Sequence, residues 1–145
     1  MLERIDQKLE QPQLQELLSY AVFPDPQVLE AVIQQYHTQD HMHLYGYQED
    51  GAWIGVIGCV EEADTPDVLR IRHLAIAPNE RGKGYGRGIL LELIETAQPS
   101  VLLAEADDEG AEFYRNIGFT VIGNGELNAA SERYLCRYEV EEEEE

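Results

Sequence analysis

The sequence predicts an α/β domain built on a mixed β-sheet. Loosely alternating apolar residues over 41–48, 52–61 and 68–77 indicate three consecutive antiparallel strands. After residue 84 the pattern changes, because apolar residues at helical spacing over 84–97 are followed by a short apolar segment at 101–106. Antiparallel strands followed by alternating strands and helices indicate a mixed sheet flanked by helices.

Two short helices are expected before the sheet, over 12–21 and 27–37, separated by Pro24-Asp25-Pro26. Glu49-Asp50-Gly51 is a tight-turn signal, so the strands on either side of it should form a hairpin. The segment from Ala63 to Asp67 is expected to be a loop.

The last part of the chain should contain one helix and two more strands. Asp107-Asp108 predicts the start of a helix over 109–117, and Gly118 predicts its end. Strands are expected over 119–122 and 133–140.

Length and composition indicate one folded domain. We expect a domain over residues 1–138 and a frayed acidic tail over 139–145. No apolar run approaches the roughly 20 residues of a membrane helix, so no membrane span is expected. The chain shows no export signal, and Cys59 and Cys136 lie in expected strands, which predicts a reducing cytoplasm.

The charge is strongly negative overall and positive in one place. Ten Lys and Arg residues against 29 Asp and Glu give a net charge of −19, which excludes nucleic acid and anionic membranes as expected partners. Half of the basic residues, however, lie between residues 70 and 87, where Glu80 is the only acid. Positive charge gathered around glycines indicates a site for a polyanionic small molecule, although pairing with acidic neighbours is the alternative.

The glycines of this segment lead from an apolar strand into a helix. Glycine lets the backbone turn tightly and approach a ligand closely, and the free N–H groups at a helix start bind phosphate. The spacing fits neither a P-loop nor a dinucleotide-binding fingerprint.

Two motifs in this order resemble those of the GNAT superfamily of N-acetyltransferases. Arg81-Gly82-Lys83-Gly84-Tyr85-Gly86, after the strand ending Leu74-Ala75-Ile76-Ala77-Pro78, is similar to the family's first signature. The segment from Ala111 to Phe119 is similar to its second signature. The resemblance covers roughly residues 41–138 and implies a GNAT-like acyl-CoA N-acyltransferase fold, whose sheet is splayed between strands four and five.

The resemblance implies acetyl-CoA as co-substrate, and the residue spacing described below predicts no metal. It assigns the pyrophosphate to the segment of Arg81, Gly82, Lys83, Gly84, Gly86 and Arg87. The backbone of Leu74 and Ile76 would pair with the pantetheine arm, and the Leu74 amide would polarise the thioester carbonyl. His37, His41 and His43 complete no recognised metal-binding spacing with a cysteine or carboxylate.

The resemblance also implies catalytic roles. Tyr114 would act as general acid toward the departing thiolate, with a packing role as the alternative. The identity of the general base is left open, because Arg70 occupies the position where some members carry a glutamate. Glu105, Glu61, Glu62 or a water molecule are the candidates. Asp107 replaces an asparagine found in many members and is expected to cap the helix.

Strand alternation places Arg70 and Arg72 on the face with Leu74 and Ile76, and His73 on the opposite face. The two arginines would bind an acidic group of the acceptor or pair with acids of neighbouring strands. His73 is expected to be structural rather than catalytic.

The sequence therefore predicts a cytoplasmic N-acetyltransferase that acetylates a primary amine by direct attack on acetyl-CoA. The alternative is a non-catalytic acyl-CoA-binding sensor or interaction subunit on the same fold. Nothing in the sequence distinguishes a monomer from a homodimer, or identifies the acceptor.

Overall fold

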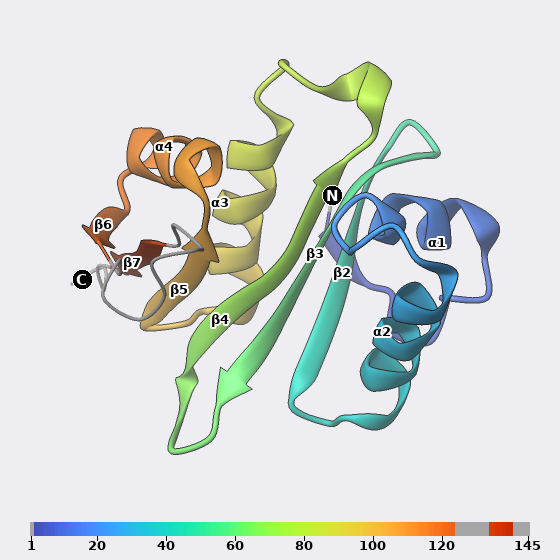
Figure 1. Cartoon of the computed structure of the whole chain (residues 1–145), viewed down its shortest axis with the longest axis horizontal. Coiled ribbons are helices and arrows are strands. Elements are labelled where there is room, and N and C mark those ends of the chain that lie inside the picture. Colours follow the sequence, from blue (N-terminus) through green and yellow to red (C-terminus); the bar gives the residue numbers. More distant parts are fainter. Residues whose placement is uncertain (1, 124–133, 141–145) are drawn as a thin grey trace. The chain divides into compact units, whose positions relative to one another are not determined.

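The computed structural model describes residues 2–123 and 134–140. In chain order the elements are β1 (Leu2–Arg4), α1 (Pro12–Ser19), α2 (Pro26–Thr38), β2 (Met42–Glu49), β3 (Ala52–Glu62), β4 (Thr65–Ile76), the 3-10 helix η1 (Pro78–Glu80), α3 (Tyr85–Ala97), β5 (Val101–Ala106), α4 (Asp108–Ile117), β6 (Thr120–Gly123) and β7 (Tyr134–Glu139) (Figure 1). The chain forms two compact units, and β3 and β4 each contribute to both. The first unit is Met1–Val60 with Arg72–Ala97, and the second is Glu61–Ile71 with Gln98–Glu145.

In the first unit the strand order is β1-β2-β3-β4, and β2 is antiparallel to both β1 and β3. The turn between β2 and β3 has positive φ at Asp50 (52°) and Gly51 (81°). Two successive positive φ angles match the right-handed twist of a hairpin, which explains why Asp-Gly works at this position. The hairpin expected from Glu49-Asp50-Gly51 is confirmed.

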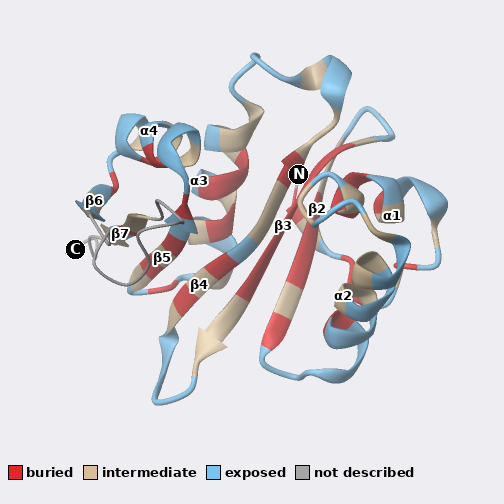
Figure 2. Cartoon of the chain, in the orientation of Figure 1, coloured by how far each residue is buried: buried red, intermediate tan, exposed pale blue. Residues whose placement is uncertain are grey.

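Helices α1 and α2 pack together in this unit, and α2 also contacts β2 (Figure 1). Helix α1 begins at Pro12, and its buried Leu14, Leu17 and Leu18 recur at the spacing of one helix face. These leucines join buried residues of the strands, including Leu44 and Val56, in one apolar core. Figure 2 shows the buried residues along the strands and on the inner sides of the helices.

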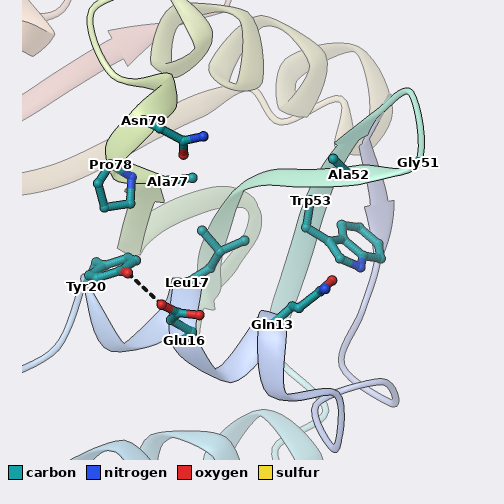
Figure 3. A pocket seen from close by; sticks show the side chains of 10 residues that line it. All are labelled: Gln13, Glu16, Leu17, Tyr20, Gly51, Ala52, Trp53, Ala77, Pro78 and Asn79. Atoms are coloured by element: carbon teal, nitrogen blue, oxygen red, sulfur yellow. Dashed lines mark hydrogen bonds between the residues drawn. The ribbon is translucent and has the colours of Figure 1, made fainter.

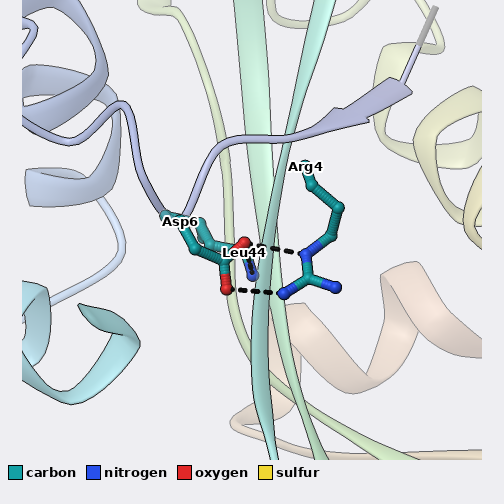
Figure 4. A network of polar contacts seen from close by, with 3 residues as sticks. All are labelled: Arg4, Asp6 and Leu44. Atoms are coloured by element: carbon teal, nitrogen blue, oxygen red, sulfur yellow. Dashed lines mark hydrogen bonds and ion pairs between the residues drawn. The ribbon is translucent and has the colours of Figure 1, made fainter. Parts of the chain in front are cut away.

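Strand β1 has only three residues and was not predicted from the sequence. It is paired with β2 over Leu2↔Tyr47 to Arg4↔Tyr45. The buried carboxylate of Asp6 accepts hydrogen bonds from Arg4 Nε (2.8 Å) and the Leu44 amide (3.3 Å) (Figure 4). A charge-assisted hydrogen bond compensates for burial of this carboxylate, and the segment is thereby held against β2.

In the second unit the strand order is β4-β5-β7-β6. Strands β4 and β5 are parallel, with register from Val68↔Val101 to Ile71↔Ala104, and each strand continues beyond that last pair. Strand β7 is antiparallel to β5 and to β6, and α4 contacts these three strands. One parallel pair among antiparallel pairs confirms the mixed sheet.

The predicted helices and strands are all present, with ends shifted by up to three residues. The loop predicted over Ala63 to Asp67 is wrong in its second half, because β4 begins at Thr65. Pro66 lies at the exposed start of this strand, where a missing N–H is tolerated.

Glu139, expected in the acidic tail, is the last residue of β7 and is paired with Val101. Residues 141–145 lie outside the described residues, and so does the segment between the strands expected over 119–122 and 133–140, apart from Gly123. The division into one domain and a tail stays a prediction. No helix in the described part of the chain is long and apolar enough to span a membrane.

Candidate active site

The glycine segment lies between the end of β4 and the start of α3, within the first unit. Gly82 (φ 79°) and Gly84 (φ 87°) both have a left-handed backbone conformation, which residues other than glycine adopt only at a cost in free energy. A Cβ atom at either position would have no atom within 4 Å. These glycines are therefore required by backbone conformation, and the space beside them is open.

Helix α3 begins at Tyr85, and its hydrogen-bond ladder begins with the Gly88 amide, which donates to the Gly84 carbonyl (3.1 Å), so the amides of Tyr85, Gly86 and Arg87 precede the ladder. Arg87 in this turn is exposed and makes no ion pair with any described residue. Such a donor set, with free amides, open backbone and an unengaged guanidinium, fits a pyrophosphate group.

The other two cations of the segment have local partners. Arg81 Nε donates to the Ile76 carbonyl (3.0 Å), and its guanidinium lies 5.5 Å from the centre of the Tyr20 ring. Lys83 Nζ pairs with Glu80 at 3.1 Å, on the surface. Exposed ion pairs are weak, so Lys83 can exchange this partner for an anion.

The residues of β4 whose backbone was expected to contact the pantetheine arm come after the part of β4 that is paired with β5. Leu74 and Ile76 follow Ile71, the last residue of β4 in register with β5. The Ile76 carbonyl accepts the bond from Arg81, and the Ile76 side chain packs over Gly55 together with Ile89 of α3.

Arg70 pairs with two carboxylates in the second unit. Arg70 Nε lies 2.7 Å from Glu62 of β3, and a terminal nitrogen of the guanidinium lies 4.0 Å from Glu105 of β5. The sequence left two roles open for Arg70, binding an acidic group of the acceptor or pairing with acids of neighbouring strands. In the structure Arg70 pairs with acids of neighbouring strands. Arg72 is exposed and forms no ion pair with any described residue.

Tyr114 is a buried residue of α4 in the second unit. Its ring centre lies 4.9 Å from that of Phe119 and 5.1 Å from that of Phe113. Among the described residues, none forms a hydrogen bond with the Tyr114 hydroxyl. Burial raises the pKa of this phenol above its usual value, so it stays protonated at neutral pH.

The neighbouring Asp107 is the N-cap of α4. Its carboxylate accepts a hydrogen bond of 2.9 Å from the Gly110 amide, as expected from the sequence. Gly118 ends the helix with φ 116°, also as expected.

The side chain of His73 contacts α2. Its Nδ1 lies 2.5 Å from the hydroxyl of Tyr36, and burial together with the charge of Arg72 lowers the pKa of His73 to about 4. The structural role expected for His73 is consistent with this contact. No group of three or more His, Cys, Asp or Glu side chains suited to a metal ion occurs in the described ranges.

The family model for acetyltransferase (GNAT) domains matches residues 6–131, which is most of the chain. This chain belongs to the GNAT acetyltransferase family. The fold class and the resemblance inferred from the two motifs are thereby confirmed.

A curated relative and two solved structures agree with this assignment. N-alpha-acetyltransferase RimI of Mycobacterium tuberculosis is 29% identical over 87 residues, and this match spans 57% of this chain and only 55% of the relative. A GNAT-family structure from Desulfovibrio desulfuricans has a TM-score of 0.77 at 17% identity, covering 96% of this chain and 98% of that one. A GNAT-family acetyltransferase from Elizabethkingia anophelis, solved with acetyl-CoA bound, has a TM-score of 0.68 at 16% identity, covering 97% of both chains.

Sequence reasoning missed a pocket in the first unit of this GNAT protein. It is lined by α1, the turn between β2 and β3, and the segment after β4 (Figure 3). Its residues are far apart in the sequence, so no local pattern indicates the pocket.

Proposed function

We propose that this protein is an N-acetyltransferase that moves an acetyl group from acetyl-CoA to a primary amine. The observation that carries the proposal is the glycine segment between β4 and α3 in a chain of the GNAT family. Its open backbone at Gly82 and Gly84 and the unengaged Arg87 support a pyrophosphate site. Arg81, Lys83 and Gly86 complete the segment, and the backbone of Leu74 and Ile76 would hold the pantetheine arm.

Direct attack requires no acetylated enzyme. The amine nitrogen attacks the thioester carbonyl carbon, the C–N bond forms, and the C–S bond breaks when the tetrahedral intermediate collapses. The Leu74 amide would stabilise the developing oxyanion. Tyr114 would donate its proton to the departing thiolate, and its raised pKa keeps that proton available at neutral pH.

The amine must also lose a proton, and we propose Glu105 as the group that accepts it. Glu105 and Glu62 both face Arg70, but their distances to its guanidinium differ, 4.0 Å against 2.7 Å. The Glu105 side chain is also more exposed, 47% against 33%. Glu105 is therefore the carboxylate less engaged by the arginine, and a base must be able to leave its resting partner.

Arg70 favours a second candidate function. A guanidinium at the position where some members carry a glutamate, already paired with two acids, is also compatible with an acyl-CoA-binding subunit that has no turnover. In that function Arg70 and Arg72 would bind a regulatory or partner carboxylate rather than an acceptor. We propose the cytoplasm as the location for either function, with a monomer or a homodimer as the assembly.

Calorimetric titration with acetyl-CoA tests the binding site. Arg87→Glu should weaken binding at least tenfold, because it removes a charge-assisted phosphate contact and adds a repulsive charge. Arg115→Glu is the matched control, because Arg115 is an exposed helix arginine in the other unit. Equal affinities of the two variants would contradict the assignment of the pyrophosphate to this segment.

Thiol release with a panel of primary amines then separates the two functions. Amine-dependent release of CoA supports the transferase. Tight binding of acetyl-CoA without release for any amine in the panel supports the binding subunit. A folded protein that does not bind acetyl-CoA would contradict both.

A further inference from the structure

The pocket of the first unit has a volume of about 340 Å³. It lies beside α1 and is bounded by Gly51, Ala52 and Trp53 on one side and by Ala77, Pro78 and Asn79 on the other (Figure 3). All of its lining residues belong to the first unit. None of them has a role in the proposed transfer reaction.

An indole ring and a phenol ring form part of the pocket wall. Trp53 lies across Gly46 of β2, where a Cβ atom would be 2.7 Å from the indole, so glycine at this position provides the space for the ring. Tyr20 is contributed by the residue that follows α1. In Figure 3 the side chains of Gln13 and Trp53 point toward one another.

Glu16 is the only charged residue of this lining. Its carboxylate accepts a hydrogen bond of 3.0 Å from the Tyr20 hydroxyl, which fixes the carboxylate beside the phenol (Figure 3). A carboxylate accepts more than one hydrogen bond, so Glu16 retains acceptor capacity while bonded to Tyr20. Gln13 and Asn79 add amide groups that can accept further hydrogen bonds.

We propose that this pocket binds an alkylammonium compound. A carboxylate and an aromatic ring are the two groups that attract an organic cation, the first by a charge-assisted hydrogen bond and the second by cation–π interaction. Trp53 supplies the ring, because Tyr20 already carries the guanidinium of Arg81 at 5.5 Å. The same carboxylate disfavours anions, and the net charge of −19 raises the local concentration of small cations. The methylene chain of such a ligand would pack against Leu17 and Trp53.

The pocket is linked to the glycine segment through one contact. Tyr20, whose hydroxyl bonds Glu16, lies under the guanidinium of Arg81 at 5.5 Å. An amine bound here could therefore be an acceptor or a non-acetylated effector, and the two sources share one recognition chemistry. Only the acceptor case rests on the proposed function.

Trp53 provides a direct probe, because it is the only tryptophan of the chain. Its fluorescence would be measured during titration with putrescine, with 1,4-butanediol as the uncharged analogue and no acetyl-CoA present. We expect a saturable change with putrescine alone. Glu16→Gln should weaken the affinity for putrescine at least tenfold, because glutamine still accepts the hydrogen bond from Tyr20 but lacks the negative charge.

Two further variants make the test specific. Glu30→Gln removes an exposed carboxylate of α2 that does not line this pocket, and its affinity should equal that of the unmodified protein. Tyr20→Phe keeps the ring and releases the carboxylate, so it should bind putrescine at least as tightly. No saturable change, an equal response to butanediol, or equal weakening by Glu16→Gln and Glu30→Gln would each overturn the proposal.

Steady-state kinetics with the same diamine separates the two sources. An acceptor would show a KM raised at least tenfold by Glu16→Gln with little change in kcat. An effector would not be acetylated and would change turnover of another amine. Both results support the pocket, and failure of the proposed function would appear separately as absent acetyl-CoA binding.

Discussion

The hydroxyl of Tyr36 on α2 lies 2.5 Å from Nδ1 of His73 on β4, which joins helix and strand inside the first unit. The lowered pKa of His73, about 4, keeps the imidazole neutral at pH 7. We therefore assign the phenol as donor and Nδ1 as acceptor. The pair has a consequence for stability at acidic pH.

The folded pKa of His73 is below the ordinary histidine value of about 6.5, so the unfolded chain takes up the proton first as pH falls. The contribution of His73 to the free energy of unfolding is therefore complete above about pH 6.5, and it is lost as the pH falls toward 4. We expect the unmodified protein to lose roughly 1–3 kcal/mol more unfolding free energy between pH 7 and pH 4.5 than His73→Asn. Urea unfolding at both pH values measures this difference. His41→Asn, at an exposed histidine, should keep the original pH dependence, and identical slopes for all three proteins would contradict the prediction.

Gly58→Ala should destabilise the first unit strongly. A Cβ atom at Gly58 would lie 2.6 Å from Cζ of Tyr36 and closer still to its hydroxyl, so the buried ring would have to move. We expect a loss of about 2–4 kcal/mol in unfolding free energy, measured by urea denaturation. Gly88→Ala is the matched control, because a Cβ there meets no atom within 4 Å and alanine favours the helix. Similar losses in both variants would show that Tyr36 is not the obstacle.

Tyr114→Phe should lower kcat by about 10²-fold or more if the phenol protonates the thiolate. The fold should be retained, since the ring contacts with Phe119 and Phe113 do not use the hydroxyl. Tyr138→Phe is the control in the same aromatic cluster, where the ring centre lies 5.3 Å from that of Phe119. A kcat unchanged by Tyr114→Phe across the pH range would remove Tyr114 from the mechanism.

The two carboxylates beside Arg70 should differ in what they contribute. Glu62→Gln loses the charge from the short 2.7 Å contact and should cost about 1 kcal/mol in unfolding free energy with a small effect on kcat. Glu105→Gln, at 4.0 Å, should cost little stability but lower kcat at least tenfold near neutral pH if it is the base. Unfolding and initial rates of both variants give the comparison. A larger loss of kcat for Glu62→Gln would transfer the role of base to Glu62.

The arrangement of helices and strands was largely predictable, because it depends on local patterns. The spacing of Leu14, Leu17 and Leu18, the Asp-Gly turn and the cap at Asp107 are each encoded within a few residues. Strand β1 was missed for the same reason: three residues carry no periodicity, and pairing with β2 and the Asp6 contacts hold them in place.

The candidate site was predictable only in part. The glycine segment and Tyr114 belong to motifs that are continuous in the sequence. The partners of Arg70 could not be chosen, because Glu62 and Glu105 lie on other strands and strand register decides which carboxylate it meets. The pocket around Glu16 combines residues from α1, from the β2–β3 turn with the start of β3, and from the segment after β4, so its composition appears only after folding.

The sequence alone therefore determined the family, the order of elements and the segment suited to a pyrophosphate, because these depend on neighbouring residues and backbone preferences. Tertiary structure decided which charges are paired, why His73 is neutral, and where an amine could bind. Those properties depend on burial and on distances between side chains that are remote in the chain. Chain folding sets those distances, and neither composition nor spacing encodes them locally.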